Sequence, residues 1–191
     1  MTDAASDERA YDAKIAILEA MSELCKTRPF SRLGVVEIAK QAGISRSSFY
    51  YHFSDRNDAV QWLSNLAFAR GIDRIGRGLS WYEGHLATTR MLVRFKPLIV
   101  AASEDAGYSG AQLFFLRHRK ANLCETMRIH GVEPTDELMF QAEALAASEQ
   151  YMTVAYIKGM FGSLAPQAFC ELLEGIVPAA LRAAVESPSA D

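Results

Sequence analysis

Two short helical runs separated by one turn place the strongest constraint on how this chain folds. Residues 34–42 carry apolar side chains at helical spacing, and the run ends at Gly43, the residue type that best tolerates a left-handed conformation after a helix. The next run begins at Ser45, whose hydroxyl is suited to cap a helix N-terminus. Two helices of this length and spacing are typical of a helix-turn-helix, in which the second helix enters the major groove of DNA.

The second run, residues 46–53, has an apolar face and a polar face. Phe49 and Phe53 lie four positions apart, so we expect both to face a core shared with the first run. The remaining side chains all donate hydrogen bonds, and they are Arg46, Ser47, Ser48, Tyr50, Tyr51 and His52. Such donors suit phosphate oxygens and base edges, and Arg46 is able to contact guanine with two hydrogen bonds.

Positive charge is concentrated around these two runs. The 191-residue chain has a formal net charge of −3, which excludes a uniformly basic nucleic-acid coat protein. Residues 26–56 nevertheless hold six basic and two acidic side chains, whereas residues 57–191 hold 12 basic and 15 acidic ones. Arg56 lies near the start of the following helix, where free backbone N–H groups also favour an anion, so we expect a phosphate contact there.

Helical patterns continue through the rest of the chain, and no segment alternates with a period of two, so we predict an all-α fold. Helices are expected at 11–27 and from Ser54, the expected N-cap with Asp55 in the first turn, to about Arg70. Further helices are expected at 85–103, 110–130, 136–161 and 166–186, the last one kinked at Pro178. Four glycines within residues 71–84 indicate a connection. These breaks predict a flexible arm at 1–10, a helix-turn-helix domain at 11–70 and a larger helical domain at 71–191.

The region from Ile15 to about Leu63 resembles the DNA-binding domain of the TetR/AcrR family of bacterial transcription regulators, above all in the segment IAKQAGISRSSFYYHF. By this resemblance, Arg46 and Ser48 contact bases, three aromatic residues after them reach base edges and backbone, and Arg56 takes the place of a phosphate-binding lysine. Gly34 stands where the family usually has a capping Thr or Ser. The expected DNA-binding set is therefore Gly34, Ser45, Arg46, Ser47, Ser48, Tyr50, Tyr51, His52 and Arg56.

The resemblance also implies that the helical body binds a small ligand and forms a homodimer on a palindromic operator, with repression as the usual outcome. Candidate ligand contacts on the central helices are Trp81, Met91, Phe95, Phe114, Phe115 and His118. Apolar stripes on the last helices supply candidate dimer contacts, which are Leu145, Met152, Tyr156, Phe169, Leu172, Leu173 and Ile176. Packing within a single chain is the alternative interpretation of both sets.

No motif of an enzyme or of a cofactor site is present, so we expect no catalysis, cofactor or metal. The four histidines at 52, 85, 118 and 130 and the three cysteines lack metal-ligand spacing, and reduced, buried thiols are the simpler reading. The acidic, polar start and the lack of a long apolar run predict a cytoplasmic protein that does not cross a membrane.

Two functions from different classes remain open. The first is a DNA-binding regulator, favoured by the polar face around Arg46. The second is a coactivator of the same fold that binds proteins and does not read DNA. The segment from Pro29 also resembles the branch of the family that regulates dihydroxyacetone kinase operons.

Overall fold

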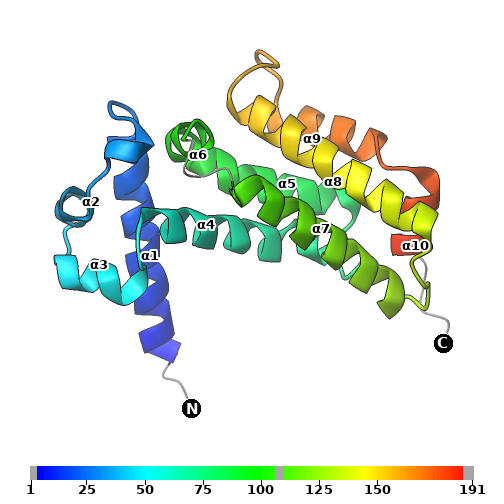
Figure 1. Cartoon of the computed structure of the whole chain (residues 1–191), viewed down its shortest axis with the longest axis horizontal. Coiled ribbons are helices and arrows are strands. Elements are labelled where there is room, and N and C mark those ends of the chain that lie inside the picture. The colour runs from blue at the N-terminus through cyan, green and yellow to red at the C-terminus, as the bar shows by residue number, and fades with distance from the viewer. Residues whose placement is uncertain (1–3, 106–109, 187–191) are drawn as a thin grey trace. The chain divides into compact units, whose positions relative to one another are not determined.

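The computed structural model describes residues 4–105 and 110–186, and every regular element among them is a helix (Figure 1). With η marking short 3-10 helices, the elements are α1 (Ala4–Leu24), η1 (Phe30–Arg32), α2 (Val35–Gln41), α3 (Arg46–His52), α4 (Arg56–Arg70), η2 (Ile72–Arg74), α5 (Trp81–Arg94), α6 (Lys96–Ser103), α7 (Gly110–Ile129), α8 (Asp136–Ile157), α9 (Pro166–Gly175) and α10 (Ala179–Glu186). The predicted all-α fold is confirmed.

Packing divides the described residues into two units. The N-terminal unit comprises residues 4–65 and 94–105, and the C-terminal unit comprises residues 66–93 and 110–186. Helix α6 belongs to the N-terminal unit, because it packs against α1 and η1 and buries Leu98 and Ala102. The domain boundary predicted at residue 70 therefore separates elements that pack together in the structure.

Helix α1 forms the centre of the N-terminal unit. It buries Ile17, Leu18 and Met21, and both α2 and α3 pack against it. The helix begins at Ala4, so the arm expected at 1–10 is helical from that residue onward. Residues 4–10 contain no Gly or Pro, and Asp7 in the first turn interacts favourably with the helix dipole.

The start of α4 is capped by a different residue from the one expected. The carboxylate of Asp55 accepts hydrogen bonds from the backbone N–H of Asn57 and of Asp58, at 2.7 and 2.9 Å. Ser54, the expected cap, instead donates its backbone N–H and its hydroxyl to the Asp58 carboxylate, at 2.8 and 3.1 Å. A carboxylate is the stronger acceptor for free N–H groups, which explains the exchange of roles.

The C-terminal unit is built on α7 and α8, which lie side by side (Figure 1). The stretch expected as one helix at 85–103 divides at Phe95, because Pro97 in the first turn of α6 has no N–H to continue the preceding helix. The stretch at 166–186 divides before Ala179, as Pro178 predicted.

Gly84 lies inside α5 and does not belong to the connection. A Cβ atom at this position would lie 2.3 Å from Cγ1 of Ile75, well inside van der Waals contact. The glycine therefore permits close packing of the chain after η2 against α5.

Candidate nucleic-acid interface

The turn between α2 and α3 is held by hydrogen bonds at both ends. Gly43 has a φ of 69°, and its N–H donates to the carbonyl of Lys40 at 3.2 Å, while the N–H of Ile44 donates to the carbonyl of Ala39 at 2.9 Å. This pattern closes the end of α2 and needs a left-handed residue. On the other side, the hydroxyl of Ser45 accepts from the N–H of Ser48 at 3.0 Å and caps α3. The angle between the two helices is therefore fixed locally.

The inner face of α3 is anchored by two aromatic rings. Phe49 is fully buried and Phe53 nearly so, and their ring centroids lie 6.2 Å apart. Ile38 and Ala39 of α2 are buried with them. Burial of Phe49 fixes the rotation of α3 about its own axis and thus decides which side chains point outward.

The outer face of α3 carries the residues that the sequence predicted for DNA contact. Arg46, Ser47, Tyr50 and Tyr51 are exposed, with Tyr51 84% accessible, while Ser48 and His52 are half-buried. The guanidinium of Arg46 lies over the Tyr50 ring at 5.5 Å from the centroid. The structure thus brings the predicted donors of α3 together on one surface.

Ser45 and Gly34, two residues predicted to bind DNA, lie at the N-termini of α3 and α2. The Ser45 hydroxyl, already used as a cap, also lies 2.8 Å from the hydroxyl of Ser47. Gly34 is the exposed N-cap residue of α2 and provides no side-chain hydrogen bond. Gly34 therefore lacks the side-chain contact that a Thr or Ser would offer at this position.

Arg56 is half-buried and contacts its own chain. Its guanidinium donates to the carbonyl of Leu33 at 3.2 Å and lies over the Phe30 ring at 5.3 Å. These contacts tie the start of α4 to the segment that leads into α2. Contact of Arg56 with a phosphate remains a prediction.

The charges around α2 and α3 differ in how they are paired. Arg28 forms an ion pair with Glu37 at 2.5 Å, whereas Arg32 and Lys40 are exposed and have no acidic partner among the described residues. Partial burial, helped by the Lys14 ammonium, holds the pKa of His52 below its usual value. His52 is therefore neutral at pH 7 in the free protein, and the fixed positive charge comes from the basic side chains around it.

Lys14 lies close to α3, although the sequence did not predict it as a functional residue. It lies on α1, and its ammonium is 5.6 Å from the Phe53 ring centroid and 5.1 Å from that of Trp62. No local pattern signals this position, because tertiary packing brings Lys14 of α1 beside Phe53 and Trp62.

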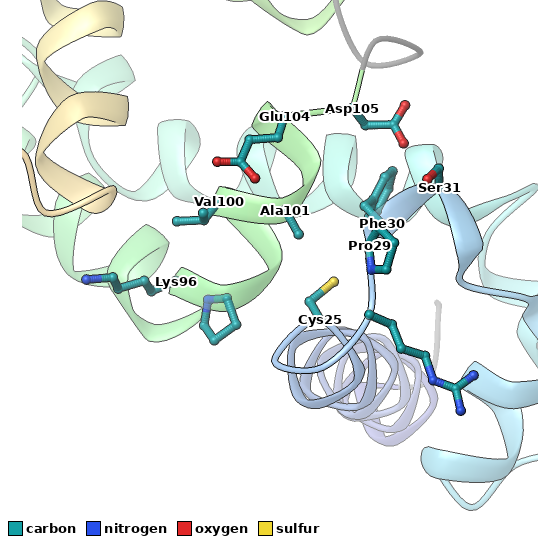
Figure 2. A pocket seen from close by; sticks show the side chains of 11 residues that line it. Cys25, Pro29, Phe30, Ser31, Lys96, Val100, Ala101, Glu104 and Asp105 are labelled. Atoms are coloured by element: carbon teal, nitrogen blue, oxygen red, sulfur yellow. The ribbon is translucent and has the colours of Figure 1, made fainter.

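A groove of about 450 Å³ lies within the N-terminal unit, between the end of α1, η1 and α6 (Figure 2). Its lining residues are Cys25, Arg28, Pro29, Phe30, Ser31, Lys96, Pro97, Val100, Ala101, Glu104 and Asp105. The thiol of Cys25 is only half-buried, in contrast to the buried Cys124 and Cys170, yet burial raises its pKa to about 11. At neutral pH this thiol stays protonated.

The candidate ligand contacts do not form one cluster. Phe95 is buried in the N-terminal unit, and the other five lie in the C-terminal unit, where Met91 is half-buried on α5. The Phe114 and His118 rings stack at 5.8 Å, and His118 lies 2.8 Å from the Asp73 carboxylate. Phe115 instead contacts Phe68, at 5.2 Å between ring centroids.

Trp81 belongs to a buried polar cluster that the sequence analysis missed. The Arg119 guanidinium is fully buried over the Trp81 ring at 5.4 Å, and it donates to both oxygens of Glu149 at 2.8 and 3.1 Å. Nε2 of His85 lies 2.9 Å from the same carboxylate. Burial raises the pKa of the Glu149 carboxyl, but the Arg119 guanidinium and His85 outweigh this effect and hold the pKa at about 2. In the sequence Arg119 stands in a basic run, RHRK, which is more typical of a solvated surface.

The candidate dimer contacts divide between core and surface. Leu145, Phe169 and Leu173 are buried within the chain, and Met152 and Tyr156 pack against the cluster that Phe169 and Leu173 form. Leu172 on α9 and Ile176, the residue that follows this helix, are exposed. The apolar stripe expected on this helix is therefore narrower than its sequence spacing indicated, since one side of it closes the intrachain core.

The geometry defines a helix-turn-helix protein with an exposed donor face on its second helix. Residues 17–60 match the tetR family of bacterial regulatory proteins, so the helix-turn-helix region is the part of the chain that is similar to this family. The family is one of regulators, which confirms the class predicted from the sequence. No curated protein sequence matches this chain.

Two solved structures share the fold. The dihydroxyacetone kinase operon activator DhaS superposes with a TM-score of 0.65 at 16% sequence identity, over 89% of this chain and 96% of that one. A transcriptional regulator from Rhodococcus sp. Rha1 gives a TM-score of 0.54 at 18% identity, over 86% of this chain and 95% of that one. In the described part of the chain, no helix is long and apolar enough to span a membrane.

Proposed function

We propose that this protein is a homodimeric transcription repressor that reads a palindromic operator and is released from it by a small molecule bound among the C-terminal helices. The observation that carries this proposal is the outer face of α3. Its donors are exposed on a helix whose rotation is fixed by Phe49 and whose start is fixed by the Ser45 cap. A surface of fixed donors matches the fixed pattern of acceptors in a major groove.

The first test selects bound duplexes from a random pool with the purified full-length protein. A palindrome with half-sites about 34 to 36 Å apart is the expected product, because a dimer presents two recognition helices. Its dissociation constant should be about 10⁻⁸ M or tighter at physiological salt. Enrichment of no sequence would contradict operator reading.

Arg46→Ala tests which residue reads the bases. Loss of a guanine contact should weaken binding to the selected palindrome by about 1 to 3 kcal/mol per half-site, with a much smaller loss on random DNA. Arg128→Ala is the matched control, since Arg128 is an exposed arginine of the C-terminal unit and its replacement removes the same charge. Equal losses on both DNAs for Arg46→Ala would contradict a base-reading role.

The proposal of a dimer is supported by apolar side chains that remain exposed on α8, on α9 and at the residue that follows α9. Tyr151 and Leu172 are each 62% accessible, and Ile176 is exposed as well. Contiguous exposed apolar residues often mark protein interfaces. Leu172→Glu should give a monomer in analytical ultracentrifugation and abolish binding to the palindrome, whereas Ile129→Glu, at an exposed position on α7, should leave the dimer intact.

Ligand release is supported by the aromatic side chains of the C-terminal unit, since apolar and aromatic linings are typical of small-molecule sites. A compound screen read by fluorescence anisotropy of the bound operator tests this part. We expect some compounds to release the DNA, and Phe114→Ala or His118→Ala to change the concentration that they need. Release that is unaffected by both variants would place the ligand elsewhere.

A second candidate function is a coactivator that acts through protein contacts. The observation in its favour is that DhaS, which shares the fold, is an operon activator. The selection experiment separates the two functions, because a coactivator that does not read DNA enriches no palindrome and loses nothing on Arg46→Ala.

A further inference from the structure

We propose that Lys14 of α1 is a DNA phosphate contact, held in place by an aromatic cage at the end of the recognition helix. This inference rests on the proposed DNA-binding function and extends its contact surface beyond the helix-turn-helix. The cage consists of Phe53, which ends α3, and Trp62 of α4, whose ring centroids lie 5.6 and 5.1 Å from the Lys14 ammonium. Tyr11, one turn earlier on α1, contacts Trp62 with a ring distance of 6.0 Å.

The cage explains why this ammonium has a defined position. A lysine side chain usually moves freely and loses entropy when it binds an anion. Attraction between a cation and two aromatic faces restrains it before binding, and it leaves the charge intact. Lys14 has no acidic partner among the described residues, whereas Lys26, in the turn that follows α1, is paired with Glu23 at 2.5 Å.

The position of the cage agrees with a phosphate contact. Helix α3 has seven residues and is thus about 10 Å long, close to the width of a major groove, about 12 Å. If the start of α3 reads base edges, its far end reaches the wall of the groove, where the phosphates lie. Phe53 marks that end, and α1 packs against α3 there (Figure 1).

His52 provides a second sign of where Lys14 lies. Partial burial and then the Lys14 ammonium lower the pKa of His52, which agrees with the position of Lys14 beside Phe53, the next residue along the chain. His52 belongs to the donor face of α3, and Lys14 adds one fixed positive charge beside Phe53, at the end of that helix.

The test measures binding to the selected palindrome and to random DNA as a function of salt. Lys14→Gln should weaken both DNAs by the same factor and lower the slope of log affinity against log salt by about 0.9 for each lost contact, about two units for a dimer. Lys14→Met should behave in the same way, because it keeps the apolar stem in the cage and removes only the charge. Lys14→Arg keeps the positive charge and should retain the salt slope of the wild type. The control Lys26→Gln should also leave this slope unchanged.

A nuclear magnetic resonance titration of His52 in the free protein provides a readout that packing alone would not move. Lys14→Gln should raise the pKa of His52, whereas Lys26→Gln should not. An unchanged salt slope in Lys14→Gln, with palindrome binding retained by the wild type, overturns the inference alone. Absence of any DNA binding by the wild type overturns the proposed function and this inference with it.

Discussion

Two arginines of this protein make almost the same contact with an aromatic ring, one on the surface and one in the interior. Arg46 lies 5.5 Å from the centroid of Tyr50, and Arg119 lies 5.4 Å from that of Trp81. Arg119 is fully buried and donates to Glu149, to the carbonyl of Ile72 and to the side chain of Asn122. Arg46 is exposed and has no hydrogen-bond partner among the described residues.

The difference shows how burial decides what an arginine does. A buried guanidinium must have all its donors satisfied, because an unpaired charge in the interior is costly. An exposed guanidinium is already satisfied by water and is free to exchange that water for a partner. Arg119 therefore specifies the fold of the C-terminal unit, and Arg46 is available for recognition.

The largest expected effect comes from breaking the buried contact. Arg119→Met should destabilise the protein by about 3 to 5 kcal/mol, because it leaves the Glu149 carboxylate buried without its partner. Urea denaturation followed by circular dichroism measures this loss. The double variant Arg119→Met with Glu149→Leu should recover much of it, and a double variant no more stable than the single one would contradict the argument.

Loss of the cap on the recognition helix should have the next largest effect. Ser45→Ala removes the side-chain acceptor of the Ser48 N–H and should cost about 1 kcal/mol of stability. Ser47→Ala is the matched control two residues away, since in the described part of the chain its hydroxyl has a hydrogen-bond partner only in that of Ser45. Thermal unfolding monitored by circular dichroism compares the two, and equal losses would show that the cap is not decisive.

The contact between Arg46 and the Tyr50 ring should affect the affinity for DNA and leave the stability of the fold almost unchanged. Tyr50→Leu removes the ring under Arg46 and should weaken operator binding by about 0.5 to 1 kcal/mol per half-site through a less restrained guanidinium. Tyr50→Phe keeps the ring, so a loss equal to that of Tyr50→Leu would assign the effect to the phenol hydroxyl. Fluorescence anisotropy with the selected palindrome gives both values, and thermal melts should show near-equal stability.

The smallest expected effect is the pH dependence at His52. The lowered pKa of His52 means that the neutral form is favoured in the folded, free protein, so its stabilising contribution is present above the ordinary pKa and is lost as pH falls toward the lowered one. Protonation over the same window adds a charge to the donor face and should tighten DNA binding as pH falls below about 6.5. His52→Gln should remove this pH dependence from anisotropy titrations, and its persistence would assign it to another group.

Much of the N-terminal unit was predictable because its signals are local. Gly43 and Ser45 act on neighbouring backbone groups, and the spacing of Phe49 and Phe53 fixes the inner face of α3 without reference to distant residues. The break at Pro178 follows from the same kind of rule. Each of these features involves residues within a few positions of each other.

The features that the sequence did not predict all depend on packing between residues far apart in the chain. The buried ion pair joins residues 30 positions apart, and the sequence around Arg119 resembles a charged surface. The caged position of Lys14 depends on two helices that follow it, and Arg56 contacts a carbonyl 23 positions before it. Exposure of Leu172 beside the buried Leu173 also depends on which side of α9 the core closes.

The sequence by itself therefore determined the helical class, the turn between α2 and α3, and the set of donors on α3, because period, cap and turn chemistry act over one or two helical turns. Only the tertiary structure decided which charges are buried and paired, where α6 packs, and how α1 supports the end of the recognition helix. Those outcomes depend on contacts between distant segments, and burial sets the free energy of each charge according to the partners that the fold brings to it.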